Sequence, residues 1–181
     1  MEDEQETSRL FDIRGAFTQQ SLIDNGFYEN NAWTKQITKV KFGDDITEIG
    51  ENAFNGCTSL TEVEFGYGIS KLGYRAFSDC PNIVYVYLPD SLGEIGERAF
   101  SGCSSIEELT LPEGVSKIGS AAFAHCQSLV KLTLPKTILE VAEDAFIYND
   151  ENLTIYVPNQ AIKDLCSGKG LPDEKIVIQE S

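Results

Sequence analysis

Basic residues are scarce in this sequence, which has 14 Lys and Arg against 29 Asp and Glu and a formal net charge of −15 over 181 residues. Nucleic acids and anionic membranes recruit proteins through basic patches. We therefore expect no nucleic-acid partner. No apolar run approaches the ~20 residues that a helix needs to cross a bilayer, so we also expect no membrane insertion.

An apolar leader is missing from the N-terminus, where residues 1–6 read MEDEQE. A secretory signal peptide requires an apolar segment, so none is expected within this chain. We expect the protein at the cell surface or secreted if a signal has been trimmed from this chain, and in the cytoplasm otherwise. Residues 1–8 are almost entirely polar and are predicted to form an acidic disordered tail.

Catalytic constellations are also missing. The single histidine, His125, is followed by Cys126, but adjacent residues of an extended segment point to opposite sides and do not form a nucleophile–base pair. There is no phosphate-binding glycine loop. The acidic clusters at 44–45, 144 and 150–151 lack the alternating oxygen ligands of a calcium loop, and we interpret them as solvated turns. We expect no enzymatic activity and no cofactor.

What the sequence does contain is an internal repeat. An Ala-Phe pair recurs every 23 residues, at Ala53-Phe54, Ala76-Phe77, Ala99-Phe100, Ala122-Phe123 and Ala145-Phe146. A period of this length held over five copies is typical of a solenoid. Since one repeat cannot bury its own apolar side, each is stable only between its neighbours.

Within each repeat, the apolar positions predict two extended pieces. One pair of columns is spaced by two residues, the period of a strand with one buried face. These columns are Val40, Val63, Val86, Leu109, Leu132 and Ile155, and Phe42, Phe65, Leu88, Leu111, Leu134 and Val157. Stacked at ~4.8 Å, such strands form a parallel sheet on one face of the coil. The Ile-x-x-Ile-Gly-x-x-Ala-Phe half-turn predicts a brief extended piece followed by a turn or 3₁₀ segment. Its glycines, Gly50, Gly73, Gly96 and Gly119, are expected to adopt a turn conformation that a side chain would resist.

Four of the five cysteines share one repeat position, at Cys57, Cys80, Cys103 and Cys126. A straight row cannot close a tetrahedron around zinc, and a ~4.8 Å spacing exceeds the Cβ–Cβ separation of ~3.8 Å that disulfides prefer. We therefore expect small buried apolar groups and no metal site. Cys166 lies outside the row and is interpreted as an incidental thiol.

The repeat defines the expected organisation of the chain. We predict a repeat array over 37–157, an N-terminal cap over 9–36 and a C-terminal cap over 158–181, because the apolar ends of an array must be covered. The N-terminal cap is expected to hold a short helix over 16–24, and the C-terminal cap to use 161–167 and a strand at 176–178. The residues expected to cover the first repeat are Phe11, Phe17, Leu22, Phe27 and Trp33.

The exposed positions of the predicted sheet are the candidate binding surface. They vary between copies, as either a partner-specific surface or an unconstrained solvated one would. The tyrosine pair Tyr85 and Tyr87 favours the first, because tyrosines are enriched at binding hot spots. Lys39/Glu62 and Lys41/Glu64 are expected to form cross-strand pairs. The predicted partner-binding residues are Tyr85, Tyr87, Glu62, Glu64, Glu108, Thr110, Lys131, Thr133 and Tyr156. Because glutamates flank the tyrosines, we expect a protein partner with a basic rim.

The repeat resembles the BspA-type leucine-rich repeat. The resemblance rests on Leu-x-x-Leu-x-Leu-Pro at 129–135 and on Val-x-x-Ile-Gly-x-x-Ala-Phe-x-x-Cys at 115–126, and it covers roughly 37–157. It implies a right-handed solenoid used for binding, often on microbial surfaces in adhesion to host proteins. The departures are Gly43 and Gly66 in place of Pro, Asn149 in place of the fifth Cys, and one extra residue before Leu153, and we expect them to loosen the ends of the array.

Two functions follow from these observations. The first is a non-catalytic protein-binding module, with the resemblance implying surface adhesion or recognition of host proteins through the exposed sheet face. The alternative is an intracellular structural or interaction scaffold.

Overall fold

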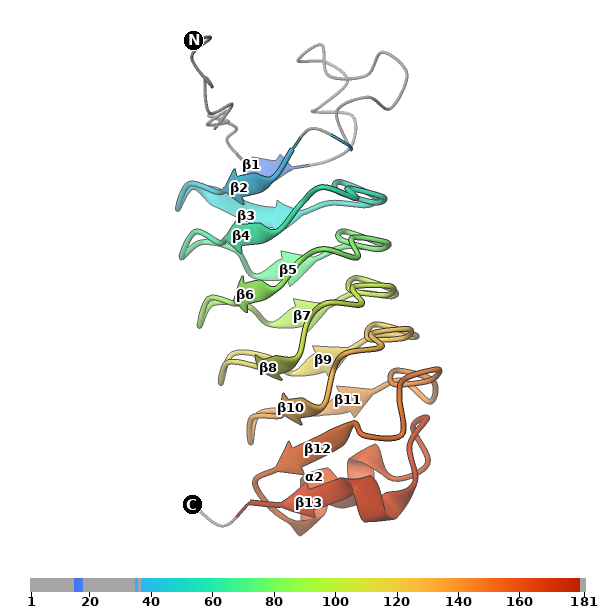
Figure 1. Ribbon diagram of the computed structural model, residues 1–181. Helices are drawn as coiled ribbons and strands as arrows, with labels where there is room; N and C mark the ends of the chain where they lie inside the picture. Colours follow the sequence, from blue (N-terminus) through green and yellow to red (C-terminus); the bar gives the residue numbers. More distant parts are fainter. Residues whose placement is uncertain (1–14, 18–34, 36, 180–181) are drawn as a thin grey trace, which may run out of the picture.

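The computed structural model describes residues 15–17, 35 and 37–179. The described chain coils into a solenoid whose turns stack along one axis, and each turn of the array contributes one strand to each of two faces (Figure 1). The predicted mostly-β parallel solenoid is confirmed. One face, here called the tyrosine face, holds β2 (Lys39–Lys41), β4 (Glu62–Glu64), β6 (Tyr85–Tyr87), β8 (Glu108–Thr110), β10 (Lys131–Thr133) and β12 (Thr154–Val157).

The second face is one continuous six-stranded parallel sheet, here called the odd-strand sheet. Its order is β1 (Gly15–Phe17), β3 (Ile46–Ile49), β5 (Lys71–Leu72), β7 (Glu94–Ile95), β9 (Lys117–Ile118) and β11 (Glu140–Val141). The Ile-x-x-Ile piece is therefore extended, as predicted. A turn closed by bonds between residues three apart follows it, as where the Ala76 N–H donates to the Gly73 carbonyl at 3.2 Å.

The first strand corrects a prediction about the N-terminal cap. Ala16 and Phe17 were expected to begin a helix over 16–24, but they lie in β1, which pairs in parallel with β3. This pairing uses backbone groups at the edge of the odd-strand sheet that would otherwise lack partners. The remainder of that helix, the tail at 1–8 and most of the expected N-terminal cap lie outside the described residues.

A stack of phenylalanines runs through the core. Phe54, Phe77, Phe100, Phe123 and Phe146 are all 0% exposed. Successive ring centroids are 5.2, 5.7, 5.8 and 6.3 Å apart, with interplanar angles of 14° or less. Because every turn places the same side chain at the same point, the core repeats from turn to turn along the solenoid axis.

The prediction that the repeat glycines adopt an unusual turn conformation is wrong. The residues two positions after these glycines have left-handed backbone conformations. They are Asn52, Arg75, Arg98 and Ala121, with φ between 49° and 55°. Gly73, Gly96 and Gly119 instead sit against the backbone of the preceding turn. A Cβ on Gly96, for example, would lie 2.5 Å from the Leu72 carbonyl oxygen. These glycines permit close stacking of turns rather than an unusual φ.

The cysteine column forms buried hydrogen bonds. The Sγ atoms of Cys80, Cys103 and Cys126 donate to phenylalanine carbonyls of the preceding turn at 3.0–3.2 Å. Asn149 takes over this role in the fifth copy. Its Nδ2 donates to the Phe123 carbonyl at 2.8 Å, and its Oδ1 accepts from the Cys126 N–H at 2.8 Å. The substitution therefore bonds the last turns together, contrary to the loosening expected from the sequence.

We expect all five thiols to be unreactive in the folded protein and fully reactive after denaturation. All are free and buried. Burial raises the pKa of Cys126 to about 12 and that of Cys166 to about 11. Since the thiolate is the reactive form, disulfide-exchange reagents should modify the native protein slowly at pH 8. Titration of the thiols with and without guanidinium chloride measures this. Rapid native reaction, or fewer than four thiols after denaturation, would contradict the buried column.

The C-terminal end of the solenoid is closed by a helix and a further strand. The helix α2 (Gln160–Cys166) starts at Asn159, whose Oδ1 accepts the Ile162 N–H at 3.0 Å. A 3₁₀ turn, η2 (Asp173–Lys175), leads into β13 (Ile176–Ile178), which pairs in parallel with β12. Within the described part of the chain, no helix has the length and apolar character needed to cross a membrane.

Candidate partner-binding site

The structure places all nine predicted partner-binding residues on strands of the tyrosine face. Tyr85 and Tyr87, on β6, are 61% and 74% exposed. Their neighbours along the solenoid axis are Glu62 and Glu64 on β4. Glu108 and Thr110 lie on β8, Lys131 and Thr133 on β10, and Tyr156 on β12.

The negative charge predicted beside the tyrosines is partly neutralised. The Lys39 Nζ lies 2.9 Å from Glu62 Oε1 and 2.7 Å from Glu64 Oε1, and the Lys41 Nζ lies 2.7 Å from Glu64 Oε2. The expected cross-strand pairs are thus confirmed. Hydrogen bonds from Lys39 and then Lys41 lower the pKa of Glu64 to about 2. Glu62 and Glu64 therefore present little free charge to a partner.

Two exposed carboxylates, Glu107 and Glu108, lie on the other side of the tyrosines, at the start of β8. Glu108 is 3.8 Å from the Lys131 Nζ, and its side chain is 65% exposed. Lys131 is shared with the Tyr156 ring, whose centroid lies 5.6 Å from the Nζ atom. Glu107 is exposed and has no ion pair within the described part of the chain. Glu107 was not among the predicted site residues.

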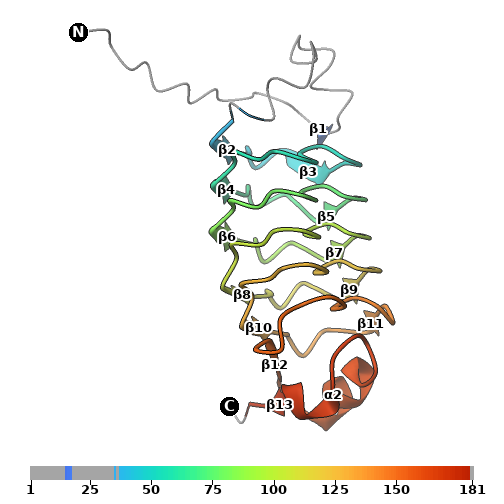
Figure 2. The same cartoon turned by 45° about the vertical axis from the view of Figure 1, so that its right-hand side comes forward.

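The tyrosine face is not the single sheet that the repeat predicts. It divides into a three-stranded sheet, β2-β4-β6, and a four-stranded sheet, β13-β12-β10-β8. On either side of this division, the residue just before each strand bonds to the equivalent residue of the preceding turn. The Val84 N–H donates to the Thr61 carbonyl at 3.1 Å, and the Val130 N–H donates to the Glu107 carbonyl at 2.9 Å. Among the described residues no such bond joins Glu107 to Val84. Both views show β6 and β8 further apart than β8 and β10 (Figures 1 and 2).

The opening is confined to one side of the coil. On the turn edge of the same two repeats, the Phe77 N–H donates to the Ala99 carbonyl at 2.8 Å. On the odd-strand sheet, β5 pairs with β7 and β7 with β9 without interruption. The turns therefore stay in register at two of their sides and separate at the third.

The break exposes residues predicted to be core. Val86 and Leu88 are only partly buried, whereas Leu109 of the Val86 column and Leu111 of the Leu88 column are each 3% exposed. Val84, just before β6, is 41% exposed. The prediction that Val86 and Leu88 are buried is therefore wrong, because no described strand pairs with β6 on its β8 side. Phe65, of the same column as Leu88, is also partly buried.

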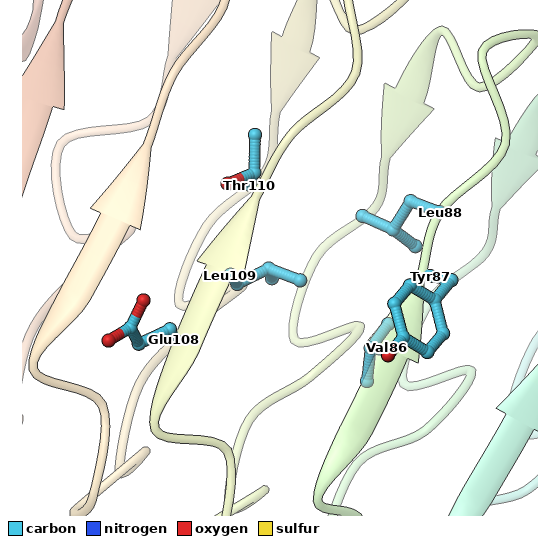
Figure 3. A pocket seen from close by; sticks show the side chains of 6 residues that line it. All are labelled: Val86, Tyr87, Leu88, Glu108, Leu109 and Thr110. Atoms are coloured by element: carbon cyan, nitrogen blue, oxygen red, sulfur yellow. The ribbon is translucent and has the colours of Figure 1, made fainter.

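A hollow of about 290 Å³ occupies the break. Its lining comes from both strands and is Val86, Tyr87, Leu88, Glu108, Leu109 and Thr110. Figure 3 shows Leu109 between the two strands, with Val86 and Leu88 along the other wall and the Tyr87 ring at the rim. The hollow thus combines an apolar floor with an exposed aromatic ring, while the Glu108 carboxylate points to the β10 side of β8, where Lys131 lies (Figure 3).

Two other parts of the described surface do not have the chemistry of a site. A hollow of about 420 Å³ runs along the turn edge, but its lining includes Arg75 and Arg98 together with Asp79 and Asp144, so its charges oppose one another. The His125 ring stacks on Tyr148 at 4.9 Å, while the Cys126 Sγ donates to a backbone carbonyl, so they form no dyad. The described residues include no cluster of three or more His, Cys, Asp or Glu placed to hold a metal ion.

A family model described as the BspA type leucine rich repeat region matches residues 21–154 in six copies. The chain belongs to this BspA-type repeat family. Repeat regions of this family are in general surface or protein-interaction modules and are typically non-catalytic. No curated protein sequence matches the chain.

Solved structures agree with this assignment. A leucine-rich repeat protein from T. pallidum is 28% identical with a TM-score of 0.61, over 67% of this chain and 59% of that one. A leucine-rich cell surface protein from Faecalibacterium prausnitzii is also 28% identical at a TM-score of 0.61, over 80% and 39%. The pneumococcal vaccine antigen PcpA is 24% identical at a TM-score of 0.64, over 80% and 42%, and supports the fold alone. This BspA-type chain spans less than two thirds of the length of each.

Proposed function

We propose that this BspA-type chain is a protein-binding module that recognises its partner through the tyrosine face. The observation that carries the proposal is the pair of exposed tyrosines beside an opened hydrophobic core. Tyr85 and Tyr87 stand on a strand that is hydrogen-bonded to β4, so their positions are fixed. Val84 is also exposed and Val86 is only partly buried, so apolar groups are accessible along this stretch of the chain, and exposed apolar surface marks interaction sites.

The partner that we propose is a protein met outside the cell, so that the module serves adhesion or host-protein recognition. This finer assignment is supported by the similarity to a protein described as a cell surface protein. The acidic balance of the chain and the exposed carboxylates of Glu107 and Glu108, of which Glu108 is shared with Lys131, favour a partner with a basic rim.

A solid-phase screen against matrix and serum proteins tests the function. The double variant Tyr85→Ala/Tyr87→Ala should bind the captured protein at least about tenfold more weakly, because aromatic hot-spot residues carry a large share of binding energy. The matched control is Tyr67→Ala/Tyr148→Ala, which removes two equally exposed tyrosines outside this face. Circular dichroism and thermal melting should show both variants folded.

Three results are informative. Loss of binding in the first variant alone supports the tyrosine face. Equal binding by wild type and both variants would move the site to another surface. No binding of any matrix or serum protein at micromolar concentration would refute the adhesion assignment and favour a scaffold inside the cell.

A further inference from the structure

We propose that the break between β6 and β8 is a docking slot for an extended peptide segment of a protein partner. The segment would add a strand between β6 and β8, place apolar side chains on the floor of the hollow and set a basic side chain beside Glu107 and Glu108. This inference rests on the proposed function and specifies how the partner is recognised.

In the described part of the chain, the backbones of β6 and β8 have unpaired groups where the two strands face each other. In three other turns the residue after the strand donates to the next turn, as Leu111 N–H does to the Thr133 carbonyl at 2.9 Å, whereas Phe65, after the paired strand β4, makes no such bond to Tyr87 among the described residues. Among the described residues, the equivalent bond from Leu88 to Thr110 is missing, as is the bond from Glu107 to Val84. The break therefore has donors and acceptors on both walls. Peptide strands bind such edges by main-chain hydrogen bonds.

The floor of the hollow is apolar and suits one face of an extended strand. A strand placed between two others requires about twice the ladder spacing, ~9.6 Å. Its side chains alternate, so every second one faces the core. The residues that they would meet are Val86, Leu88 and Leu109, which line the hollow of about 290 Å³. The occupant should therefore have apolar residues at alternate positions, which would restore the burial that Val86 and Leu88 lack.

The negative charge of the chain selects the occupant of the slot. Glu107 has no ion pair among the described residues, and the closest cation to Glu108 is Lys131 at 3.8 Å. If a second copy of this chain bound here, its carboxylates would face those of the first copy, and each copy has a net charge of −15. Like charges facing each other across an interface are costly. A segment of another protein with Lys or Arg next to its apolar residues has no such penalty.

Hydrogen–deuterium exchange of the free protein is the first part of the test. The amides of Leu88 and Glu107 should exchange much faster than those of Leu111 and Val130, which are bonded at the same repeat positions. Slow exchange at Leu88 and Glu107 at low protein concentration would show a closed sheet and would overturn the proposal. If these two amides become protected only as the protein concentration rises, the slot binds a second copy of the chain, and the proposal of a different partner is overturned.

The second part uses synthetic peptides as probes. A blocked seven-residue peptide with alternating valine and terminal lysines should bind and protect the amides of Leu88 and Glu107. A version with proline at the centre should bind at least about tenfold more weakly, because proline cannot donate to the ladder. Binding of both peptides with equal affinity, or binding without protection of these amides, would overturn the proposal.

Charge variants complete the test without touching the core. Glu107→Lys/Glu108→Lys should weaken binding of the lysine peptide about tenfold or more. The matched control Glu143→Lys/Glu151→Lys makes the same charge change at exposed positions on the turn edge and should have little effect. If both double variants weaken peptide binding equally, the peptide is held by non-specific charge attraction, and the proposed slot is overturned. Failure of the peptides while Tyr85→Ala/Tyr87→Ala still abolishes partner binding would refute strand addition and leave the proposed function standing.

Discussion

Replacement of Phe100 by alanine should lower the free energy of unfolding by about 3–5 kcal/mol. The side chain is 0% exposed and lies between Phe77 and Phe123, with ring centroids 5.7 and 5.8 Å away. The turns above and below are held by backbone bonds, as where the Phe100 N–H donates to the Ala122 carbonyl at 2.9 Å. They cannot collapse into the space left by the ring, so a cavity term adds to the lost transfer energy.

Equilibrium urea unfolding followed by circular dichroism measures this change. Tyr87→Ala is a suitable reference, because it removes an aromatic ring that is 74% exposed and should cost little stability. A loss below about 1 kcal/mol for Phe100→Ala would mean that the ring is not packed as described. A broadened transition would indicate that the two halves of the array unfold separately, as repeat arrays do when one interface is weakened.

The sequence predicts best those features of the fold that recur in every repeat. The Phe54 column and the Cys57 column recur at fixed spacing, so their burial follows from the period alone. The same holds for the two extended pieces of each turn, since the Ile-x-x-Ile spacing and the alternating columns recur in every copy. The parallel arrangement then follows from stacking identical turns.

The parts that the sequence does not reveal depend on contacts between particular turns. Val86 fits the apolar column as well as Val63 does. Val63 lies on β4, which is paired on both sides, whereas Val86 lies on β6, which has no described strand paired on its β8 side. Asn149 departs from its column, yet its amide reproduces the bond that a cysteine thiol makes and adds others. A periodic pattern describes what each turn shares and carries no information on where two adjacent turns separate.

The candidate site shows the same division. The outward direction of Tyr85 and Tyr87 follows from strand alternation, and the structure agrees. The hollow beside them depends on the break, which no residue pattern indicates. The neutralisation of Glu64 by two lysines also requires the side-chain geometry across two strands.

Replacement of Gly96 by alanine should destabilise the protein by about 3 kcal/mol or more, because it adds one methyl group where two backbones meet. The new Cβ would lie 2.5 Å from the Leu72 carbonyl oxygen and 2.9 Å from the Gly73 carbonyl carbon. The same oxygen accepts the Gly96 N–H at 2.8 Å. Relief of the clash therefore requires loss of this hydrogen bond or separation of the two turns, and both disturb the odd-strand sheet.

Gly93, three residues earlier in the same turn, provides the control. A Cβ there would meet its nearest atoms at 3.6 and 3.9 Å, which is ordinary contact. Gly93→Ala should therefore be neutral or gain about 0.4–1 kcal/mol, because alanine has less conformational entropy in the unfolded chain. Urea unfolding of the two variants side by side separates steric contact from general loss of glycine flexibility. Equal effects at both positions would mean that the glycines serve local flexibility, and a large loss at Gly96 alone would show that they set the distance between turns.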